Sequence, residues 1–391
     1  MSNANAYFFP KEQSEYLKKL KESKRRTQKN DLLPSSISLR AKMPPIYHQE
    51  NRGTCVSNSV VALIEYFGDC KLRFSVQYLH EATKQFERAG VERNLEMLKK
   101  GEKVHPAFEI AYHKQILQLK MIQAANEGNE NAVKPFFETF ASGVRSRVMD
   151  DSGTLLRSCF RVLETRGVCR YSLWPYSPAA GTLLPEDVAQ LPPGTDEDAL
   201  KHRMPLGLYF LRSPKNVDEI RSILSGANSR RPMPVCITMD YFEGCDEFDF
   251  SFPKFLEDEN GQIYTNNRRK GLHGVLIVGY NDDPSVAGGG YFIVRNSWGD
   301  KWSDGGYGKV PYAYVECFAV EAGSILQDMV DYLGDNYGGM TKPKSKKNFP
   351  LWLKIVIHLI IILTAVIATM AVGIIFDDPL GLRQVKQTET K

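Results

Sequence analysis

The first half of the chain carries apolar residues at helical spacing. From Cys55 to Phe67 they form one stripe, which predicts a buried helix whose first turn holds Cys55. We expect a second helix near 75–90 and a further one near 153–166. Residues about 84–150 are charged and helix-favouring, and they show no obvious chemistry.

The second half changes to short apolar runs separated by Gly and Pro. Residues 177–205 are rich in Pro, Gly and Asp and are expected to form a long surface loop. Four β-rich runs follow and predict a sheet or barrel: PVCITM, GVLIVGY, GGYFIVRNS and YGKVPY. Helices first and strands later indicate a two-part α+β protein, with a cleft where the parts meet.

One segment near the C-terminus has the length and composition of a membrane span. Between residues 355 and 376 only His358 is strongly polar, and a helix of this length would cover roughly 33 Å. Lysines between residues 342 and 354 precede the span, whereas Asp377 and Asp378 follow it. Because the basic flank stays cytosolic, we expect a single-pass membrane protein whose folded domain lies on the cytosolic side.

Composition excludes several classes of function. A net charge of +4 over 391 residues gives no case for nucleic acid as a partner. The seven cysteines are scattered, and no pair has the spacing of a zinc or redox motif, so we expect no metal site and no cofactor. Their odd number and wide spacing favour free thiols in a reducing compartment. The N-terminus lacks the apolar stretch of a signal peptide.

Cys55 lies where a cysteine becomes reactive. The unpaired N–H groups and the dipole at a helix N-terminus favour the thiolate. Gln49 stands six residues earlier, and Gly53 permits the tight turn that would bring its amide beside the thiol. The amide and the backbone N–H of Cys55 could then stabilise the oxyanion of a tetrahedral intermediate.

These residues and two later motifs resemble the papain-like cysteine peptidase family. That family has a glutamine six residues before its nucleophile. The segment GLHGVLIVGY around His273 is similar to the family's segment around its catalytic histidine. The motif NSWG, which begins at Asn296, is similar to the family's asparagine motif and continues through Trp302 to GGY.

Carried over by position, the resemblance implies a role for each residue. Cys55 is the nucleophile, His273 is the base and then the acid, and Asn296 orients the imidazole. Gln49 supplies an oxyanion donor, and Trp298 packs over the Asn–His contact within the substrate-binding region.

Gly153 corresponds to a glycine that pairs with the substrate backbone in this family. Its alternative reading, a simple turn glycine, remains open.

The resemblance covers residues 33–83 and 151–325 and implies a papain-like two-lobe α+β fold. A helical lobe faces an antiparallel, barrel-like β lobe. The expected parts are a polar arm 1–32, a peptidase domain 33–330 with a helical insertion about 84–150, a basic tether 331–350, a transmembrane helix 351–376 and a short tail 377–391.

The implied function is a cysteine-type peptidase that cleaves a peptide or protein substrate through a Cys55 acyl-enzyme. Two alternatives stay open. The chain could be a catalytically silent papain-like binding scaffold at a membrane, or a Cys-dependent acyltransferase.

The sequence also departs from the family pattern. Arg52 stands where the family has a disulfide-forming cysteine, and Val56 and Asn58 replace aromatic residues near the nucleophile. The N-terminal arm lacks the pattern of an inhibitory propeptide. Cys55 and His273 are 218 residues apart, more than the roughly 130–150 typical of the family, because of the insertion. Our hypothesis is that segment 84–150 limits access to the cleft.

Overall fold

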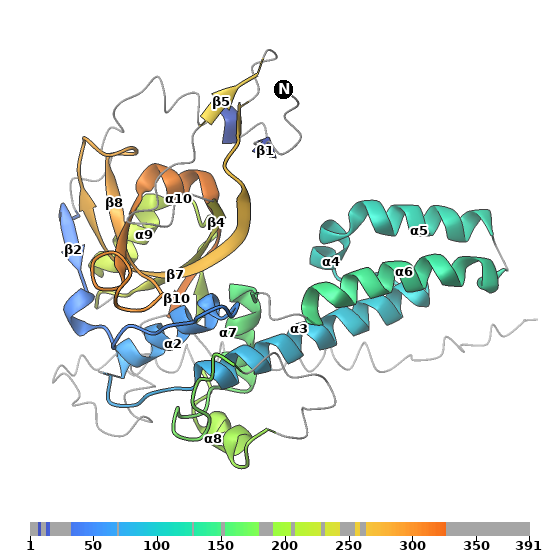
Figure 1. Cartoon of the computed structure of the whole chain (residues 1–391), viewed down its shortest axis with the longest axis horizontal. Helices are drawn as coiled ribbons and strands as arrows, with labels where there is room; N and C mark the ends of the chain where they lie inside the picture. Colours follow the sequence, from blue (N-terminus) through green and yellow to red (C-terminus); the bar gives the residue numbers. More distant parts are fainter. Residues whose placement is uncertain are drawn as a thin grey trace, which may run out of the picture. The chain divides into compact units, whose positions relative to one another are not determined.

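The structure, a computed structural model, describes most of the chain between residues 33 and 325 (Figure 1). The described ranges are 7–8, 13–15, 33–68, 70–126, 129–149, 153–179, 191–204, 208–227, 231–242, 255–258 and 263–325. The chain divides into two compact units, Met1–Met340 and Thr341–Lys391. The expected tether, transmembrane helix and tail lie outside the described residues, as does most of the N-terminal arm. Within the described residues, no helix combines the length and apolar composition that a membrane crossing requires.

Helices dominate the first half of the chain, as the periodicity predicts. The described helices are η1 (Arg40–Lys42), α2 (Cys55–Phe67), α3 (Val76–Lys99), α4 (Pro106–Ala111), α5 (His113–Ala125), α6 (Glu130–Met149), α7 (Leu156–Thr165), α8 (Thr195–Lys201), α9 (Val217–Ser225) and α10 (Tyr312–Phe318). The helix expected from Cys55 to Phe67 is confirmed with both of its ends.

The strands form two antiparallel sheets. They are β1 (Tyr7–Phe8), β2 (Ser36–Ser38), β3 (Leu208–Phe210), β4 (Val235–Phe242), β5 (Phe255–Glu257), β6 (Ile263–Thr265), β7 (Arg269–Asp282), β8 (Gly290–Arg295), β9 (Tyr307–Pro311) and β10 (Ala319–Ile325). The large sheet has the order β3-β10-β4-β7-β8-β9, with β2 paired to β7, and the small sheet has the order β1-β6-β5. Each of the four runs predicted as strands overlaps one described strand, which is β4, β7, β8 or β9.

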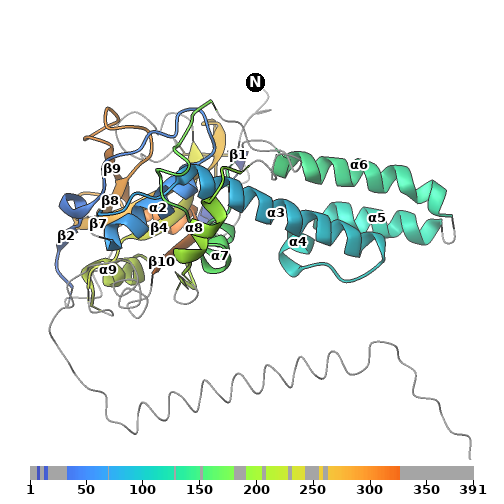
Figure 2. The ribbon, with the colours of Figure 1, turned by 90° about the horizontal axis from the view of Figure 1, so that it is seen from below.

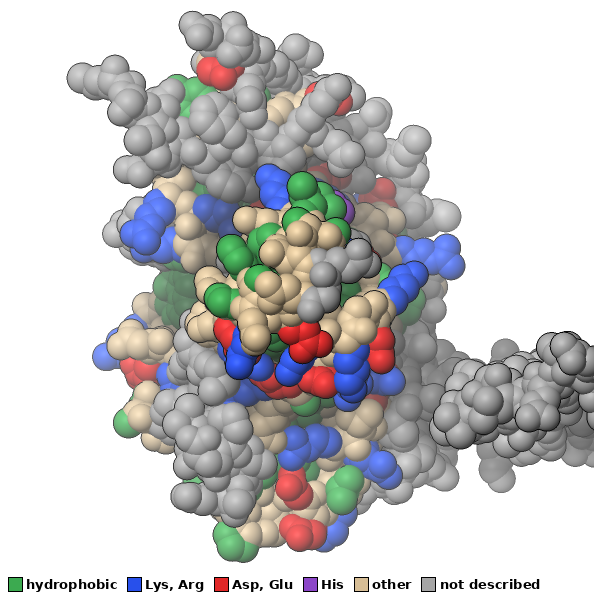
Figure 3. Space-filling model, turned by 90° about the vertical axis from the view of Figure 1, so that its right-hand side faces the viewer, with side chains coloured by type: hydrophobic (Ala, Val, Ile, Leu, Met, Phe, Trp, Pro, Cys, Tyr) green, Lys and Arg blue, Asp and Glu red, His purple; other side chains and the backbone are tan. Residues whose placement is uncertain are grey.

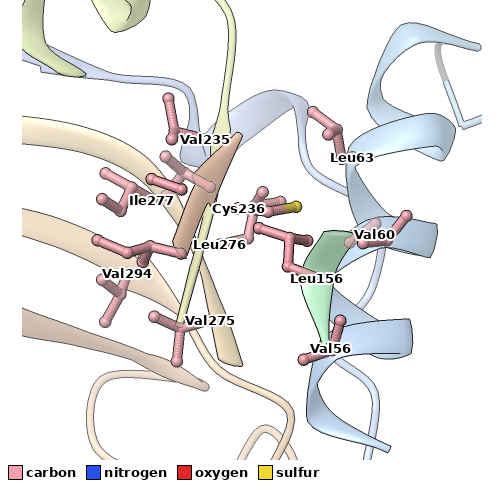
Figure 4. Close-up of a cluster of buried hydrophobic side chains, with 14 of the residues drawn as sticks. Val56, Val60, Leu63, Leu156, Val235, Cys236, Val275, Leu276, Ile277 and Val294 are labelled. Carbon is pink, nitrogen blue, oxygen red and sulfur yellow. The ribbon is translucent and has the colours of Figure 1, made fainter. Parts of the chain in front are cut away.

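The main core lies between α2 and the large sheet (Figure 4). Val56, Val60 and Leu63 of α2 point toward apolar residues of β4 and β7, which include Cys236 and Leu276. These side chains are nearly or completely buried. Because burial of each such side chain contributes about 1.5–3 kcal/mol, this interface fixes the N-terminus of α2 against the sheet.

The segment 84–150 is helical and has a second core. α3 begins in the main core and continues beyond it, where α4, α5 and α6 pack beside its C-terminal half (Figures 1 and 2). Eight buried residues form this core: Leu95, Leu98, Val104, Phe108, Ile116, Leu119, Ala141 and Val144. We call residues 93–144 the helical extension. Figure 3 views the molecule from its right-hand side and shows apolar side chains exposed among charged ones.

Two expectations about element boundaries are wrong. The second helix does not end near residue 90, because buried Leu95 and Leu98 extend α3 to Lys99. The expected surface loop 177–205 contains α8, where Gly194 adopts a left-handed conformation and three acidic residues favour the first helical turn. The hydrophobic pattern gave too little signal for a helix of seven residues.

Candidate active site

Cys55 is the first residue of α2 and is 6% exposed. The Asn58 amide donates to the backbone carbonyl of Thr54 at 2.9 Å and contacts the Thr54 hydroxyl at 3.0 Å, which anchors the chain just before the helix. The backbone N–H of Gly274 on β7 donates to Cys55 Sγ at 3.4 Å. The thiol therefore lies against the peptide bond that joins His273 to Gly274, although 218 residues separate the two segments.

Gly274 makes this contact possible. A Cβ atom at that position would lie 3.0 Å from Val56 Cγ2 and 3.1 Å from the Val56 backbone nitrogen. The α2 backbone and β7 approach too closely for a side chain between them. The glycine after His273 thus has a steric reason to be present.

The imidazole of His273 is held by Asn296. His273 Nε2 lies 2.9 Å from Asn296 Oδ1, and the same oxygen accepts the Ser297 backbone N–H at 2.8 Å. Because a backbone N–H can only donate, the Asn296 oxygen must face both groups, so Nε2 carries the proton. The neutral imidazole then presents an unprotonated Nδ1, as a general base requires.

Aromatic rings cover this contact. Trp298 stacks on His273 with ring centroids 4.7 Å apart and an interplanar angle of 27°. Tyr241 approaches both rings, at 5.8 Å from His273 and 5.7 Å from Trp298. Trp302 meets Trp298 edge-on at 5.4 Å. The rings fix the plane of the imidazole and exclude water from one of its faces.

The Gln49 amide is oriented by two hydrogen bonds. Its nitrogen donates to the backbone carbonyl of Arg52 at 2.7 Å, and its oxygen accepts from the Ser297 hydroxyl at 2.5 Å. A carbonyl only accepts, so the NH₂ group of Gln49 must face Arg52 and its oxygen must face Ser297. Gln49 also binds Ser297 through the backbone, with its N–H donating to the Ser297 carbonyl at 2.8 Å.

Ser297 and Tyr176 are two site residues whose roles sequence reasoning missed. Ser297 joins Gln49 to Asn296 through its hydroxyl and its backbone N–H. The Tyr176 hydroxyl donates to the Gln49 carbonyl at 2.7 Å and lies 3.1 Å from Thr54 Oγ1. Both residues stand in motifs that the sequence presents, NSWG and WPY, but only the fold reveals their partners.

Burial sets the charges of the site. It raises the pKa of the Cys55 thiol, and the N–H groups of Gly274 and Val56 partly oppose that rise. Burial also lowers the pKa of His273 from 6.5 to about 4, against the hydrogen bond with Asn296. Desolvation therefore favours the neutral form of the Cys55 thiol and the neutral form of the His273 imidazole.

Gly153 lies beside the loop that precedes Cys55. A Cβ atom built on Gly153 would meet the Gly53 carbonyl at 3.8 Å, an ordinary contact, and Gly153 itself is exposed. The six described cysteines, Cys55, Cys70, Cys159, Cys169, Cys236 and Cys317, are free. No cluster of metal-binding side chains occurs among the residues that the structure describes.

Known proteins resemble this chain in part. Residues 247–324 match the family described as Papain family cysteine protease. This range includes His273 and Asn296 but neither Gln49 nor Cys55. An uncharacterized peptidase C1-like protein of Acanthamoeba polyphaga mimivirus is 27% identical over 206 residues, which are 50% of this chain and 58% of the relative.

Vignain of Vigna mungo is 31% identical over 158 residues, which are 40% of this chain and 36% of vignain. The chain thus spans less than two thirds of the length of either relative. Xylellain, a cysteine protease from Xylella fastidiosa, has a similar structure with a TM-score of 0.45 and 18% identity, over 82% of this chain and 90% of that one. Part of this chain, residues 247–324, thus matches the papain-family cysteine protease model, and the named relatives are similar to between 40% and 50% of the chain.

Proposed function

We propose that this chain hydrolyses peptide bonds as a cysteine-type peptidase, with Cys55 as nucleophile and His273 as its acid–base partner. The observation that carries the proposal is the double hydrogen bond to Asn296 Oδ1. These bonds support a proton on His273 Nε2 and an unprotonated Nδ1 that acts as the base. His273 lies on β7, and the next residue, Gly274, donates its N–H to the Cys55 thiol.

The reaction proceeds through an acyl-enzyme. The Cys55 thiol gives its proton to His273 and its sulfur attacks the substrate carbonyl carbon. The free N–H of Gln49 and the backbone N–H of Cys55 stabilise the oxyanion. The C–N bond then breaks as His273 protonates the leaving amine, and a thioester remains on Cys55. Water, deprotonated by His273, attacks the thioester and releases the carboxylic acid and the thiol.

The burial of Cys55 and His273 affects the first step, the proton transfer between them. Isolated charges on Cys55 and His273 are disfavoured in this environment, because each would lose its hydration. Proton transfer between them creates both charges together, so their mutual attraction and the α2 dipole offset the cost. We infer that the reactive ion pair forms as a unit.

Labelling by an epoxide inactivator of papain-like enzymes tests the proposal. We expect one label per chain, at Cys55, and no label in the Cys55→Ala variant. Peptide turnover should disappear in Cys55→Ala and in His273→Ala. A silent binding scaffold would show no turnover in the unchanged protein, and turnover that survives Cys55→Ala would remove Cys55 from the mechanism.

We also propose that the peptidase domain is held at a membrane, on its cytosolic side, by the segment 351–376. The support is the sequence alone: an apolar stretch of spanning length, preceded by lysines and followed by Asp377 and Asp378. In membrane vesicles, protease should remove the peptidase domain from the cytosolic face and leave the tail protected. Release of the protein by alkaline carbonate would contradict a spanning segment.

A further inference from the structure

Arg52 is an unusual residue in the loop between Gln49 and Cys55, because its long, charged side chain is only 3% exposed. The guanidinium donates through Nη1 to Gln77 Oε1 at 2.6 Å and through Nη2 to Glu81 Oε1 at 2.9 Å. It also donates to the backbone carbonyl of Ser177 at 3.3 Å. The loop before the nucleophile is therefore fastened to α3 by a buried ion pair.

The acceptors on α3 are themselves ordered. Gln77 and Glu81 lie one helical turn apart, and the Gln77 amide nitrogen donates to Glu81 Oε1 at 3.0 Å. This bond turns the Gln77 oxygen toward Arg52. Both residues are almost fully buried. The fork of the guanidinium meets two fixed acceptors, a geometry that a lysine ammonium could not reproduce.

The backbone of Arg52 completes the connection to the site. Its carbonyl accepts the Gln49 amide at 2.7 Å, and its N–H donates to the Gln49 carbonyl at 3.2 Å. A shift of Arg52 would move the atom that orients the Gln49 amide. Arg52 therefore does two things: its side chain anchors the loop on α3, and its carbonyl orients the Gln49 amide.

We propose that Arg52 is a positioning residue that fixes Gln49 as oxyanion donor, through a noncovalent clamp to Gln77 and Glu81 on α3. This inference rests on the proposed function. Through Gln49, the clamp affects stabilisation of the tetrahedral intermediate. It leaves the nucleophilicity of Cys55 unchanged, because the thiol is held separately by α2 and by Gly274.

The test compares two reactions of Cys55 in the full chain. Peptide hydrolysis develops an oxyanion, whereas alkylation of the thiol by iodoacetamide does not. The double variant Arg52→Met/Glu81→Gln removes both charges of this ion pair and leaves the amides at positions 77 and 81 to bond each other, so we expect the fold to be retained. We expect kcat for peptide hydrolysis to fall about 10- to 100-fold, with KM and the alkylation rate nearly unchanged.

A double-mutant cycle with Gln49→Ala tests whether Arg52 acts through Gln49. In the Gln49→Ala background, Arg52→Met/Glu81→Gln should lower kcat by less than about twofold, since residues that act as a unit are not additive. Full multiplication of the two losses would overturn the proposal. An equal fall in hydrolysis and alkylation would overturn it too, because it would mean general disorder of the site.

A second Arg–Glu pair provides a control, and its glutamate, Glu92, lies on α3 as Glu81 does. Arg145→Met/Glu92→Gln removes an exposed Arg–Glu pair at 2.8 Å between α6 and the far end of α3, and should leave both rates within about twofold. Failure of the proposed function has a separate sign, turnover that survives Cys55→Ala. The clamp then retains its own readout, which is hydrogen exchange at the backbone amide of residue 52. We expect faster exchange there in the double variant than in the control, and unchanged exchange would overturn the clamp.

Discussion

At the scale of single residues, Gln49, the proposed oxyanion donor, is oriented by Ser297, to which we assign no chemical step. Ser297 donates its hydroxyl to Gln49 Oε1 and its N–H to Asn296 Oδ1. We expect Gln49→Ala to lower kcat about 10²–10³-fold, as loss of an oxyanion donor does. Ser297→Ala frees the amide to rotate and should cost less, about tenfold. Steady-state kinetics on one peptide would check both values.

Two outcomes would contradict this reading. A loss below tenfold in Gln49→Ala would remove Gln49 from the oxyanion hole. A larger loss in Ser297→Ala than in Gln49→Ala would mean that Ser297 acts chiefly through Asn296 and the imidazole. Alkylation of Cys55 should proceed at the same rate in both variants, which controls for a damaged nucleophile.

The buried imidazole also makes stability depend on pH. The pKa of His273 is about 4 in the folded chain against 6.5 when unperturbed, so the unfolded chain binds more protons between these values. Stability should therefore fall as pH drops from about 6.5 to 4, by about 3 kcal/mol from this group, with no further loss below. His273→Gln, compared with its parent in a Cys55→Ala background, should lose less stability on acidification. Urea unfolding at pH 7 and pH 4.5 measures the loss in unfolding free energy of each variant. An equal loss in the two variants would contradict a lowered pKa of His273 as the cause.

At the scale of elements, the contact between α2 and β7 brings Cys55 and Gly274 together. Substitutions at two glycines test the importance of this contact. Gly274→Ala would place a Cβ 3.0–3.2 Å from the Val56 side chain and backbone, so β7 must move away from α2. We expect a loss of about 1–3 kcal/mol in unfolding free energy and a large loss of turnover. Gly153→Ala meets only the Gly53 carbonyl at 3.8 Å and should leave stability unchanged.

Turnover of Gly153→Ala then decides between the two readings of that glycine. A residue that pairs with the substrate backbone would raise KM when it acquires a side chain, whereas a simple turn glycine would change neither constant. Urea unfolding and kinetics of both variants provide the measurement. Unchanged stability in Gly274→Ala would contradict the close approach of the two elements.

The sequence predicts elements well where one core face dictates the pattern. The apolar stripe from Cys55 to Phe67 and the four β-rich runs correspond to described elements because each packs on the main core. Prediction fails where the partner is distant. Nothing near Arg52 in the sequence indicates Glu81 as its partner, because their ion pair exists only after α3 packs beside the loop. The charged stretch 84–150 likewise conceals a second core, whose apolar residues are sparse.

At the scale of the whole molecule, α3 connects the site to the helical extension. Its first turns hold Gln77 and Glu81 against Arg52, and its last turns place Leu95 and Leu98 in the second core. The expected insertion boundary at 84 is therefore unsuitable for deletion, because Lys84 and Arg88 are buried. A deletion must instead begin beyond Arg88.

α3 and α6 approach each other closely enough to define a better deletion. Arg88 Nε donates to the Val148 carbonyl at 3.2 Å, and Glu92 binds Arg145 at 2.8 Å. Removing residues 93–144 and joining the two helices by a short glycine-rich turn would remove the second core and retain the main core. If the extension limits access to Cys55, kcat/KM for a protein substrate should rise several-fold, while kcat for a short peptide stays constant. Unchanged kcat/KM for both substrates would reject an access role, and lost turnover with intact folding would instead mean that the extension supports the α3 clamp.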